Sequence, residues 1–253
     1  MTECKIPELE IYGLTDEGLV RDHNEDYIAW YEDTGLVILA DGMGGHNAGE
    51  VASELAVTSI SDALEEVLSP DIRESCDMDL EEVVNEAVVF ANEEINMHAR
   101  AHPECSGMGT TVVMTLFYND RVICASVGDS RIYRFRKGEL QQITTDHSLV
   151  QEMVDNGYMS EEEALNSTNR NLITRALGIA EEVKVDVKQD KTEKDDIYLL
   201  CSDGLSDMIS DEEIFSTLVK SRDNLKRATE SLIEQAKKNG GHDNVSVILA
   251  ACR

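Results

Sequence analysis

Four aspartates stand where apolar stretches of the sequence begin or end. Asp41 follows LVILA and opens DGMGGH, and Asp203 follows IYLLCS and opens DGLSD. Asp129 lies in a Gly-Asp-Ser turn, and Asp243 comes just before the last apolar stretch. A turn would explain any one of them, because Asp-Gly and Asp-Asn are common turn pairs. All four together need partners, since an unpaired charge beside a core is costly and Lys and Arg are scarce in these segments.

Divalent cations are the partners that these carboxylates indicate. Ligands that are all oxygen favour Mg(II) or Mn(II) over Zn(II). Two such ions, about 3.5–4 Å apart, can hold a bridging water, lower its pKa and clamp a phosphoryl group. The glycines after Asp41 and Asp203 let the backbone approach closely, and the Gly42 carbonyl could itself bind a metal. The residues therefore predict a metal-dependent hydrolase without indicating its substrate.

The acidic composition excludes several classes of partner. Of the 253 residues, 51 are Asp or Glu and 22 are Lys or Arg, which gives a formal net charge of −29. Such a surface repels nucleic acid and anionic lipid heads, so we expect no nucleic-acid and no membrane partner. An anionic substrate can bind only where the local electrostatic potential is positive, and bound divalent cations would make it so.

The cysteines and the N-terminus indicate a cytoplasmic protein. The six cysteines form no CxxC pair and no spacing typical of a disulfide framework. Cys124, Cys201 and Cys252 lie in apolar runs, as buried thiols in a reducing compartment do. The chain shows no signal peptide and no run of about 18 apolar residues. No linker or repeat divides the sequence, so residues 1–253 are predicted to form a single catalytic domain.

Six apolar runs predict β-strands, because they are rich in Val, Ile and Leu and end at Gly, Asp or Asn. They cover residues 36–40, 110–117, 121–127, 131–135, 197–201 and 245–251. Their continuous apolar character indicates strands that are buried on both faces. The three consecutive runs between 110 and 135 are expected to form an antiparallel meander.

Four segments predict helices with one apolar face. Two cover residues 48–68 and 79–98, a third follows the capping box of Ser210 and Glu213, and the last covers about 223–239. Paired strands between blocks of helix indicate an α+β fold with antiparallel sheets inside and helices outside.

Eight segments of the sequence resemble the protein phosphatase 2C family, in its order and with its spacing. They are RDHNED (21–26), LADGMGGHNAGEVAS (39–53), GMGTT (107–111), VGDSRIYR (127–134), TTDHS (144–148), ITRALG (173–178), CSDGLSDM (201–208) and GGHDNVSVI (240–248). The resemblance implies a central sandwich of two antiparallel β-sheets flanked on both faces by α-helices. It also implies hydrolysis of phosphoserine and phosphothreonine in proteins by a water that bridges two Mn(II) or Mg(II) ions.

The same resemblance assigns metal ligands. Asp41 would bridge both metals, with the Gly42 carbonyl on one of them. Asp203 and Asp243 would complete the other metal.

Four further acidic residues receive supporting roles by resemblance. Glu25 would hold metal-bound waters, and Asp26 beside it would support that network. Asp129, together with Asp207, matches a third and weaker metal position of the family.

Arg21 matches the arginine that grips the substrate phosphate, a task that suits its planar fork of donors. Met43 stands where eukaryotic members carry a histidine that acts as general acid, and bacterial members share this difference. His46 could supply the proton instead. A loop histidine that only makes local hydrogen bonds, with a metal-bound water as the acid, is an equally open alternative.

The resemblance also implies partners: phosphoserine and phosphothreonine proteins, and a bacterial Hanks-type Ser/Thr kinase that the chain, a monomer, would oppose.

Residues 148–178 would form a mobile flap over the site, or a helical surface excursion without a regulatory role. One alternative is an inactive member that serves as a binding module, against which the complete set of aligned ligands argues. Another is a specialised phosphatase acting on one regulatory phosphoprotein, a type that usually carries sensor or coiled-coil domains.

Overall fold

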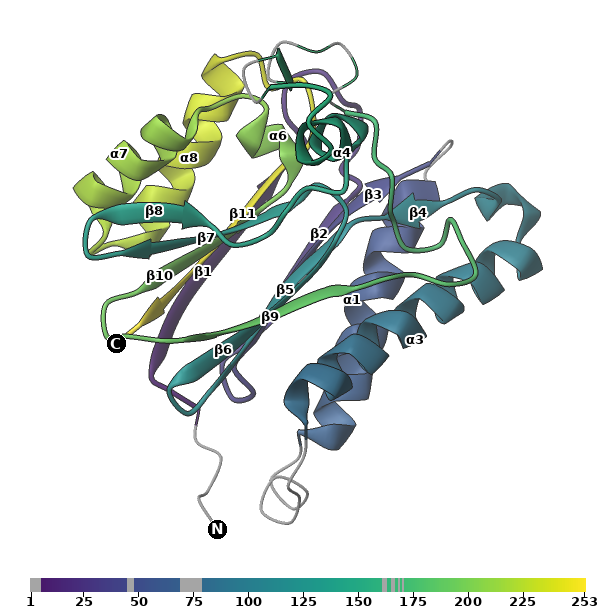
Figure 1. The fold of residues 1–253 in the computed structure, drawn as a ribbon, viewed down its shortest axis with the longest axis horizontal. Coiled ribbons are helices and arrows are strands. Elements are labelled where there is room, and N and C mark those ends of the chain that lie inside the picture. The colour runs from purple at the N-terminus through teal and green to yellow at the C-terminus, as the bar shows by residue number, and fades with distance from the viewer. Residues whose placement is uncertain are drawn as a thin grey trace.

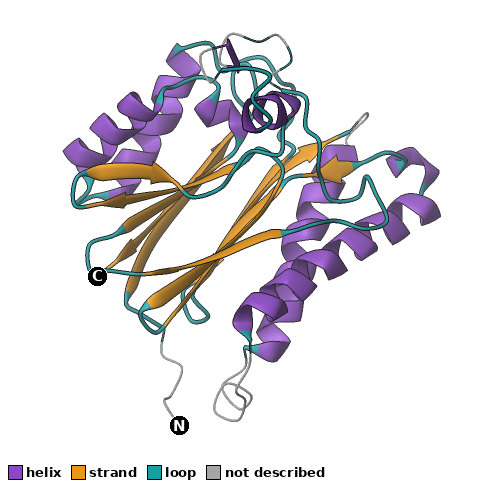
Figure 2. Cartoon of the chain, viewed as in Figure 1, coloured by secondary structure: helices purple, strands orange, loops and turns teal. Residues whose placement is uncertain are grey.

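The chain folds into two antiparallel β-sheets stacked face to face, with a pair of helices on each outer face (Figures 1 and 2). The computed structural model describes residues 6–44, 48–68, 79–160, 163, 164, 167, 169 and 171–253. Helices α1 and α3 cover one sheet, and α7 and α8 cover the other (Figure 1). The predicted α+β sandwich is confirmed.

The strand order of each sheet brings distant parts of the chain together. The five-stranded sheet has the order β1 (Leu9–Asp16), β11 (Val245–Cys252), β10 (Ile197–Cys201), β7 (Arg131–Arg136) and β8 (Glu139–Gln142). The six-stranded sheet has the order β2 (Asp26–Tyr31), β3 (Leu36–Met43), β5 (Val112–Tyr118), β6 (Arg121–Val127) and β9 (Asp186–Lys191). Its sixth strand, β4 (Gly109–Thr110), pairs with the end of β3.

Alternate residues of a strand point to different cores, which explains the continuous apolar runs. In β3, Ile38 and Ala40 pack in the core under α1 and α3. Val37 and Leu39, on the other face of the same strand, pack in the core between the sheets. All four side chains are fully buried. The expectation of strands buried on both faces is therefore confirmed.

The helices begin at the signals that the sequence provides. In the described ranges, the long helices are α1 (Ala48–Val67), α3 (Leu80–Ala101), α7 (Asp211–Ser221) and α8 (Leu225–Lys238), and the shorter ones include α4 (Leu149–Asp155), α6 (Asp203–Ser206) and the 3-10 turn Pro103–Cys105. The capping box of Ser210 and Glu213 is present at the start of α7. It satisfies backbone N–H groups that would otherwise lack a partner at the helix terminus.

The predicted meander is wrong. β5 and β6 pair as expected, but β7 leaves them and pairs with β10 and β8 in the opposite sheet. The Gly128-Asp129-Ser130 turn is thus a crossing between sheets, and Gly128 has a φ of +111° there. The sequence also gave no prediction for β1, β2, β8 and β9, whose mixed burial lacks a continuous apolar run.

None of the helices in the described ranges has both the length and the apolar character needed to cross a bilayer. Cys124, Cys201 and Cys252 are free and buried in β-strands, as expected from their apolar surroundings.

Candidate metal and phosphate site

Strand order brings three of the aspartates to one edge of the five-stranded sheet. β10 runs antiparallel to both neighbours, so its last residue, Cys201, pairs with the start of β7 and with a residue near the start of β11. Asp203 lies two residues after β10, whereas Asp129 and Asp243 each lie two residues before a neighbouring strand. The three aspartates therefore meet at the same edge of the sheet, at the end where α6 follows β10. Figure 1 shows α6 at this end of the sheet.

The facing sheet contributes Asp41 and Asp26, which pair directly across β3 and β2. Like charges at this position destabilise a sheet unless something compensates them. Thr111 fixes the backbone of Asp41 from the other side. Its N–H donates to the Asp41 carbonyl at 2.9 Å, and its Oγ1 accepts from the Asp41 N–H at 3.2 Å.

The carboxyl groups raise one another's pKa. Burial, followed by the charges of neighbouring aspartates, raises the pKa of Asp41 and Asp203 well above the ordinary value. Burial is also the main cause for Asp26 and Asp129, whose pKa values rise to about 6. Cations among these groups would offset both effects, because they favour the ionised form.

Unpartnered oxygens show that the cluster suits metal ions. Oδ1 of Asp26 and Oδ1 of Asp129 are buried without a hydrogen-bond partner in the described part of the chain, although buried polar atoms are nearly always paired. Within the same ranges, no three acidic, histidine or cysteine side chains close into a ligand cage. An open set of carboxylate oxygens fits Mg(II) or Mn(II), which keep bound waters, better than a closed structural site.

The backbone at Gly42 is enclosed on two sides. Its N–H donates to the Glu25 carbonyl at 3.1 Å. A Cβ at Gly42 would lie 2.2 Å from the Gly49 carbonyl oxygen and 2.5 Å from that of Glu25. Only glycine fits between these two backbones, which agrees with a backbone group placed at a ligand site.

Arg21 lies in the same cluster. Its Nη2 donates to Oδ2 of Asp243 at 2.7 Å, and its side chain remains 50% exposed. The hydrogen bond to Asp243, with the charges of Asp243, Glu25 and Asp41, raises the pKa of Arg21 and keeps it a cation. A half-exposed guanidinium beside the carboxylates has donors left for a phosphate.

Glu25 is buried at the junction between the two sheets. Its N–H donates to Oδ1 of Asn244 at 2.9 Å, and its Oε1 lies 3.4 Å from Nε2 of His23. Asp26, next to it, accepts a hydrogen bond from Ser202 at 2.9 Å through Oδ2.

The side chains around Asp129, the predicted third metal position, are also acidic. The charges of Asp146 and Asp207 help to raise the pKa of Asp129. Asp146 is held by Arg131, whose Nε and Nη2 donate to both of its oxygens. The N–H of Asp207 donates to the Asp203 carbonyl at 2.8 Å, so α6 places Asp207 one helical turn after Asp203.

Asn244 is the residue whose role sequence reasoning missed. Besides the bond to Glu25, its Nδ2 donates to the carbonyls of Glu17 and His23 at 3.1 and 2.9 Å. It thereby ties the loop that carries Arg21 to the loop that carries Asp243. Its place inside the GGHDN segment was the available signal, but an asparagine after an aspartate also suits an ordinary turn.

Two histidines lie in the segments that resemble the family, His46 in LADGMGGHNAGEVAS and His147 in TTDHS. His46 lies outside the described residues. His147 is buried, and its Nδ1 accepts from the N–H of Gly128 at 3.0 Å. Burial and the charge of Arg175 lower its pKa, so it is a neutral side chain that supports the turn before Asp129.

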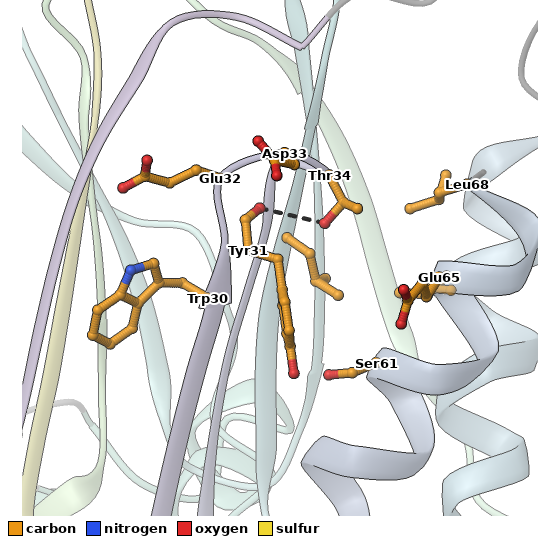
Figure 3. Close-up of a pocket in the computed structure, with 10 residues that line it drawn as sticks. Trp30, Tyr31, Glu32, Asp33, Thr34, Ser61, Glu65 and Leu68 are labelled. Atoms are coloured by element: carbon orange, nitrogen blue, oxygen red, sulfur yellow. Dashed lines mark hydrogen bonds between the residues drawn. The ribbon is translucent and has the colours of Figure 1, made fainter. Parts of the chain in front are cut away.

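A separate pocket lies at the far end of the β2–β3 hairpin from Asp26 and Asp41 (Figure 3). Its volume is about 460 Å³, and its walls include Trp30, Tyr31 and Glu65. None of its described lining residues is Lys, Arg or His. Its carboxylates would repel a phosphate, so it is not the site of the aspartate cluster.

The raised pKa values predict how the stability of the metal-free protein depends on pH. Between the unfolded value near 4 and about 6, folded Asp26 and Asp129 keep protons that the unfolded chain has lost. The unfolded state then binds fewer protons, so the free energy of unfolding falls as pH rises, on the order of 3 kcal/mol per group. Urea unfolding of the metal-stripped protein at pH 4.5, 6 and 7.5 measures this slope, and Asp129→Asn should make it shallower. An unchanged slope in Asp129→Asn would contradict the assignment.

Comparisons with known proteins agree with this geometry. The sequence profile described as protein phosphatase 2C matches residues 20–241. The serine/threonine phosphatase stp of Listeria monocytogenes is 40% identical over 238 residues, which cover 93% of this chain and 92% of that protein. The crystal structure of the Mycobacterium tuberculosis serine/threonine phosphatase PstP/Ppp superposes with a TM-score of 0.85 at 40% identity, over 97% of this chain and 99% of that one. The PstP catalytic domain in complex with two manganese ions gives 0.83 at 39% identity, over 96% and 97%.

A two-sheet sandwich with helices outside, and aspartates beside an arginine at one end of it, define a metal-dependent phosphatase. The chain belongs to the protein phosphatase 2C family. The family resemblance of the sequence is thereby confirmed.

Proposed function

We propose that this chain hydrolyses phosphoserine and phosphothreonine in proteins with two Mn(II) or Mg(II) ions. The observation that carries the proposal is the group of aspartates that raise one another's pKa beside a single half-exposed arginine. Such a group of carboxylates destabilises the folded protein when no cation is bound. Divalent cations would neutralise the carboxylates and provide positive charge for catalysis. The names of the relatives, which are serine/threonine phosphatases, support the substrate class.

The central ligands are proposed from their positions at the strand ends. Asp41 would contact both cations, the Gly42 carbonyl one of them, and Asp203 and Asp243 the other. When bound, the cations supply a water of lowered pKa and positive charge next to the phosphoryl oxygens.

The neighbouring carboxylates would hold what surrounds the cations. Glu25 and Asp26 would orient bound waters, because both are buried next to the Asp41 strand. Asp129 with Asp207 would form the third, weaker position. The proton for the leaving alkoxide would come from His46 or from a metal-bound water.

Arg21 would bind the phosphate and orient it. Its fork can meet two phosphate oxygens while Asp243 holds the guanidinium in place from the other side. This arrangement lowers the loss of freedom on binding and keeps the phosphorus facing the cations.

The biological setting is proposed by family membership. The chain would act as a single catalytic domain and a monomer in the cytoplasm, on phosphoproteins modified by a bacterial Hanks-type Ser/Thr kinase. The reduced, buried cysteines support a reducing compartment.

An assay with and without metal tests the proposal against a binding-module role. The metal-stripped protein, given p-nitrophenyl phosphate and a phosphothreonine peptide, is expected to be inactive and to regain activity with Mn(II). Release of phosphate from both substrates supports the enzyme. Binding of the phosphopeptide by a folded, Mn(II)-loaded protein without turnover would favour the binding module.

A further inference from the structure

Two adjacent aliphatic side chains are exposed immediately before the phosphate-binding arginine. Leu19 is 62% exposed and Val20 is 60% exposed, and Arg21 follows them in the chain. Single exposed apolar residues are common on protein surfaces, but a contiguous pair at the entrance of a site indicates a contact surface.

The loop that carries them is held firmly, so their exposure is not a result of a loose backbone. The N–H of Leu19 donates to the Gly241 carbonyl at 2.8 Å. Asn244 binds the loop on both sides through the carbonyls of Glu17 and His23. A rigid loop that presents apolar side chains loses little conformational freedom when a ligand covers them.

The Gly18 position shows how closely this loop lies against the Asp243 loop. Gly18 has a φ of +79°, and a Cβ there would lie 2.3 Å from the Asp243 carbonyl oxygen. The turn at Gly18 therefore holds the backbone that leads into Leu19 close to the Asp243 loop.

The spacing of residues in a peptide indicates which part of a substrate would contact Leu19 and Val20. Neighbouring Cα atoms are about 3.8 Å apart in any trans peptide, so the residue beside a phosphorylated side chain is about one Cα step from it. With the phosphate on Arg21, a substrate residue beside the phosphorylated one is within a few residue lengths of the two residues that precede Arg21, Leu19 and Val20. Asp22, which follows Arg21, and Asp243, which accepts its hydrogen bond, make an acidic flanking residue unfavourable, and the exposed Leu19 and Val20 favour an aliphatic one over a polar one.

We propose that Leu19 and Val20 form an apolar subsite for an aliphatic side chain next to the phosphorylated residue of the substrate. This inference rests on the proposed function, because Arg21 must bind the phosphate. It names a substrate class: phosphoserine or phosphothreonine segments with Leu, Ile or Val directly beside the phosphorylated residue. Binding energy from such a remote contact favours peptide turnover without affecting a substrate that lacks flanking residues.

Two phosphothreonine peptides of equal length and charge test the subsite, one with leucine and one with glutamine on both sides of the phosphothreonine. The Mn(II)-loaded wild type is expected to show about a tenfold higher kcat/KM for the leucine peptide. The double variant Leu19→Ser/Val20→Ser should lose this preference and keep the wild-type rate on p-nitrophenyl phosphate. Val219→Ser, which removes a similarly exposed aliphatic side chain on α7, is the matched control and should keep the preference.

The outcomes separate this inference from the proposed function. Equal kcat/KM for the two peptides in the wild type, or a preference that survives in the double variant, overturns the subsite. A lower rate of the double variant on p-nitrophenyl phosphate as well would mean that the loop acts through Arg21 and also overturns it. Absence of turnover on every substrate by the Mn(II)-loaded wild type would instead refute the proposed function.

Discussion

Asp41→Asn is expected to remove nearly all Mn(II)-dependent phosphatase activity while leaving the fold intact. A carboxylate shared by two cations contributes on the order of 4 kcal/mol to the transition state, so the rate should fall about 1,000-fold. The variant should also be more stable than the wild type when both are free of metal. Burial and four neighbouring aspartates make ionised Asp41 unfavourable in the metal-free fold, and asparagine carries no charge.

The combination of lost activity and gained stability distinguishes a ligand from a structural residue. Single-turnover assays with saturating Mn(II), and urea unfolding in the presence of a chelator, measure the two effects. Asp120→Asn makes the same change of charge at an exposed position in the turn between β5 and β6 and should alter neither quantity. A destabilised metal-free Asp41→Asn would show that the carboxylate stabilises the fold, in disagreement with the raised pKa.

Arg21→Ala is expected to lower kcat/KM about 100-fold on both phosphopeptides and p-nitrophenyl phosphate, because two charge-assisted hydrogen bonds to the phosphate are lost. Arg21→Lys should recover part of the loss, since lysine keeps the charge but not the planar fork. The same kinetic assays measure both variants.

The contact between Arg21 and Asp243 provides the control for this prediction. If Arg21 served only as a salt-bridge partner of Asp243, its removal would free a carboxylate and strengthen Mn(II) binding without harming turnover. Tighter Mn(II) binding with unchanged kcat/KM would therefore contradict the phosphate-binding role.

The sequence predicted the strands and helices that have a strong local signal. β6 and β10 match the predicted ranges, and β11 matches within one residue, because each is buried on both faces and is mostly apolar. The capping box at Ser210 and Glu213 is an interaction within one helical turn, so the residue types alone predict it.

Pairing between strands carries no such local signal. The step from β6 to β7 has the short turn of a hairpin, yet the two strands lie in different sheets. A polar strand such as β9 is defined by its partner β6 and its position at the edge of a sheet. Tertiary contacts decide such strands more than their composition does.

The site residues also divide into those with a local sequence signal and those whose role depends on tertiary contacts. Asp203, Asp129 and Asp243 were recognisable because each lies two residues from the end of a buried strand, and Asp41 because it follows the apolar run of β3, although the strand itself continues to Met43. The direct pairing of Asp26 with Asp41 depends on the register of two strands. The bridging role of Asn244 depends on three backbone groups in a loop more than 200 residues away, so it became visible only in the folded chain.

The most direct test of the account is a calorimetric titration of Mn(II) into the metal-stripped protein. For the wild type we expect at least two equivalents to bind, and for Asp41→Asn a loss of the tight binding. The apparent affinity of the wild type should weaken as pH falls below about 6, where protons compete for Asp26 and Asp129. Binding that Asp41→Asn leaves unchanged, or no binding by a folded wild type, would contradict the assignment of the aspartate cluster as a metal site.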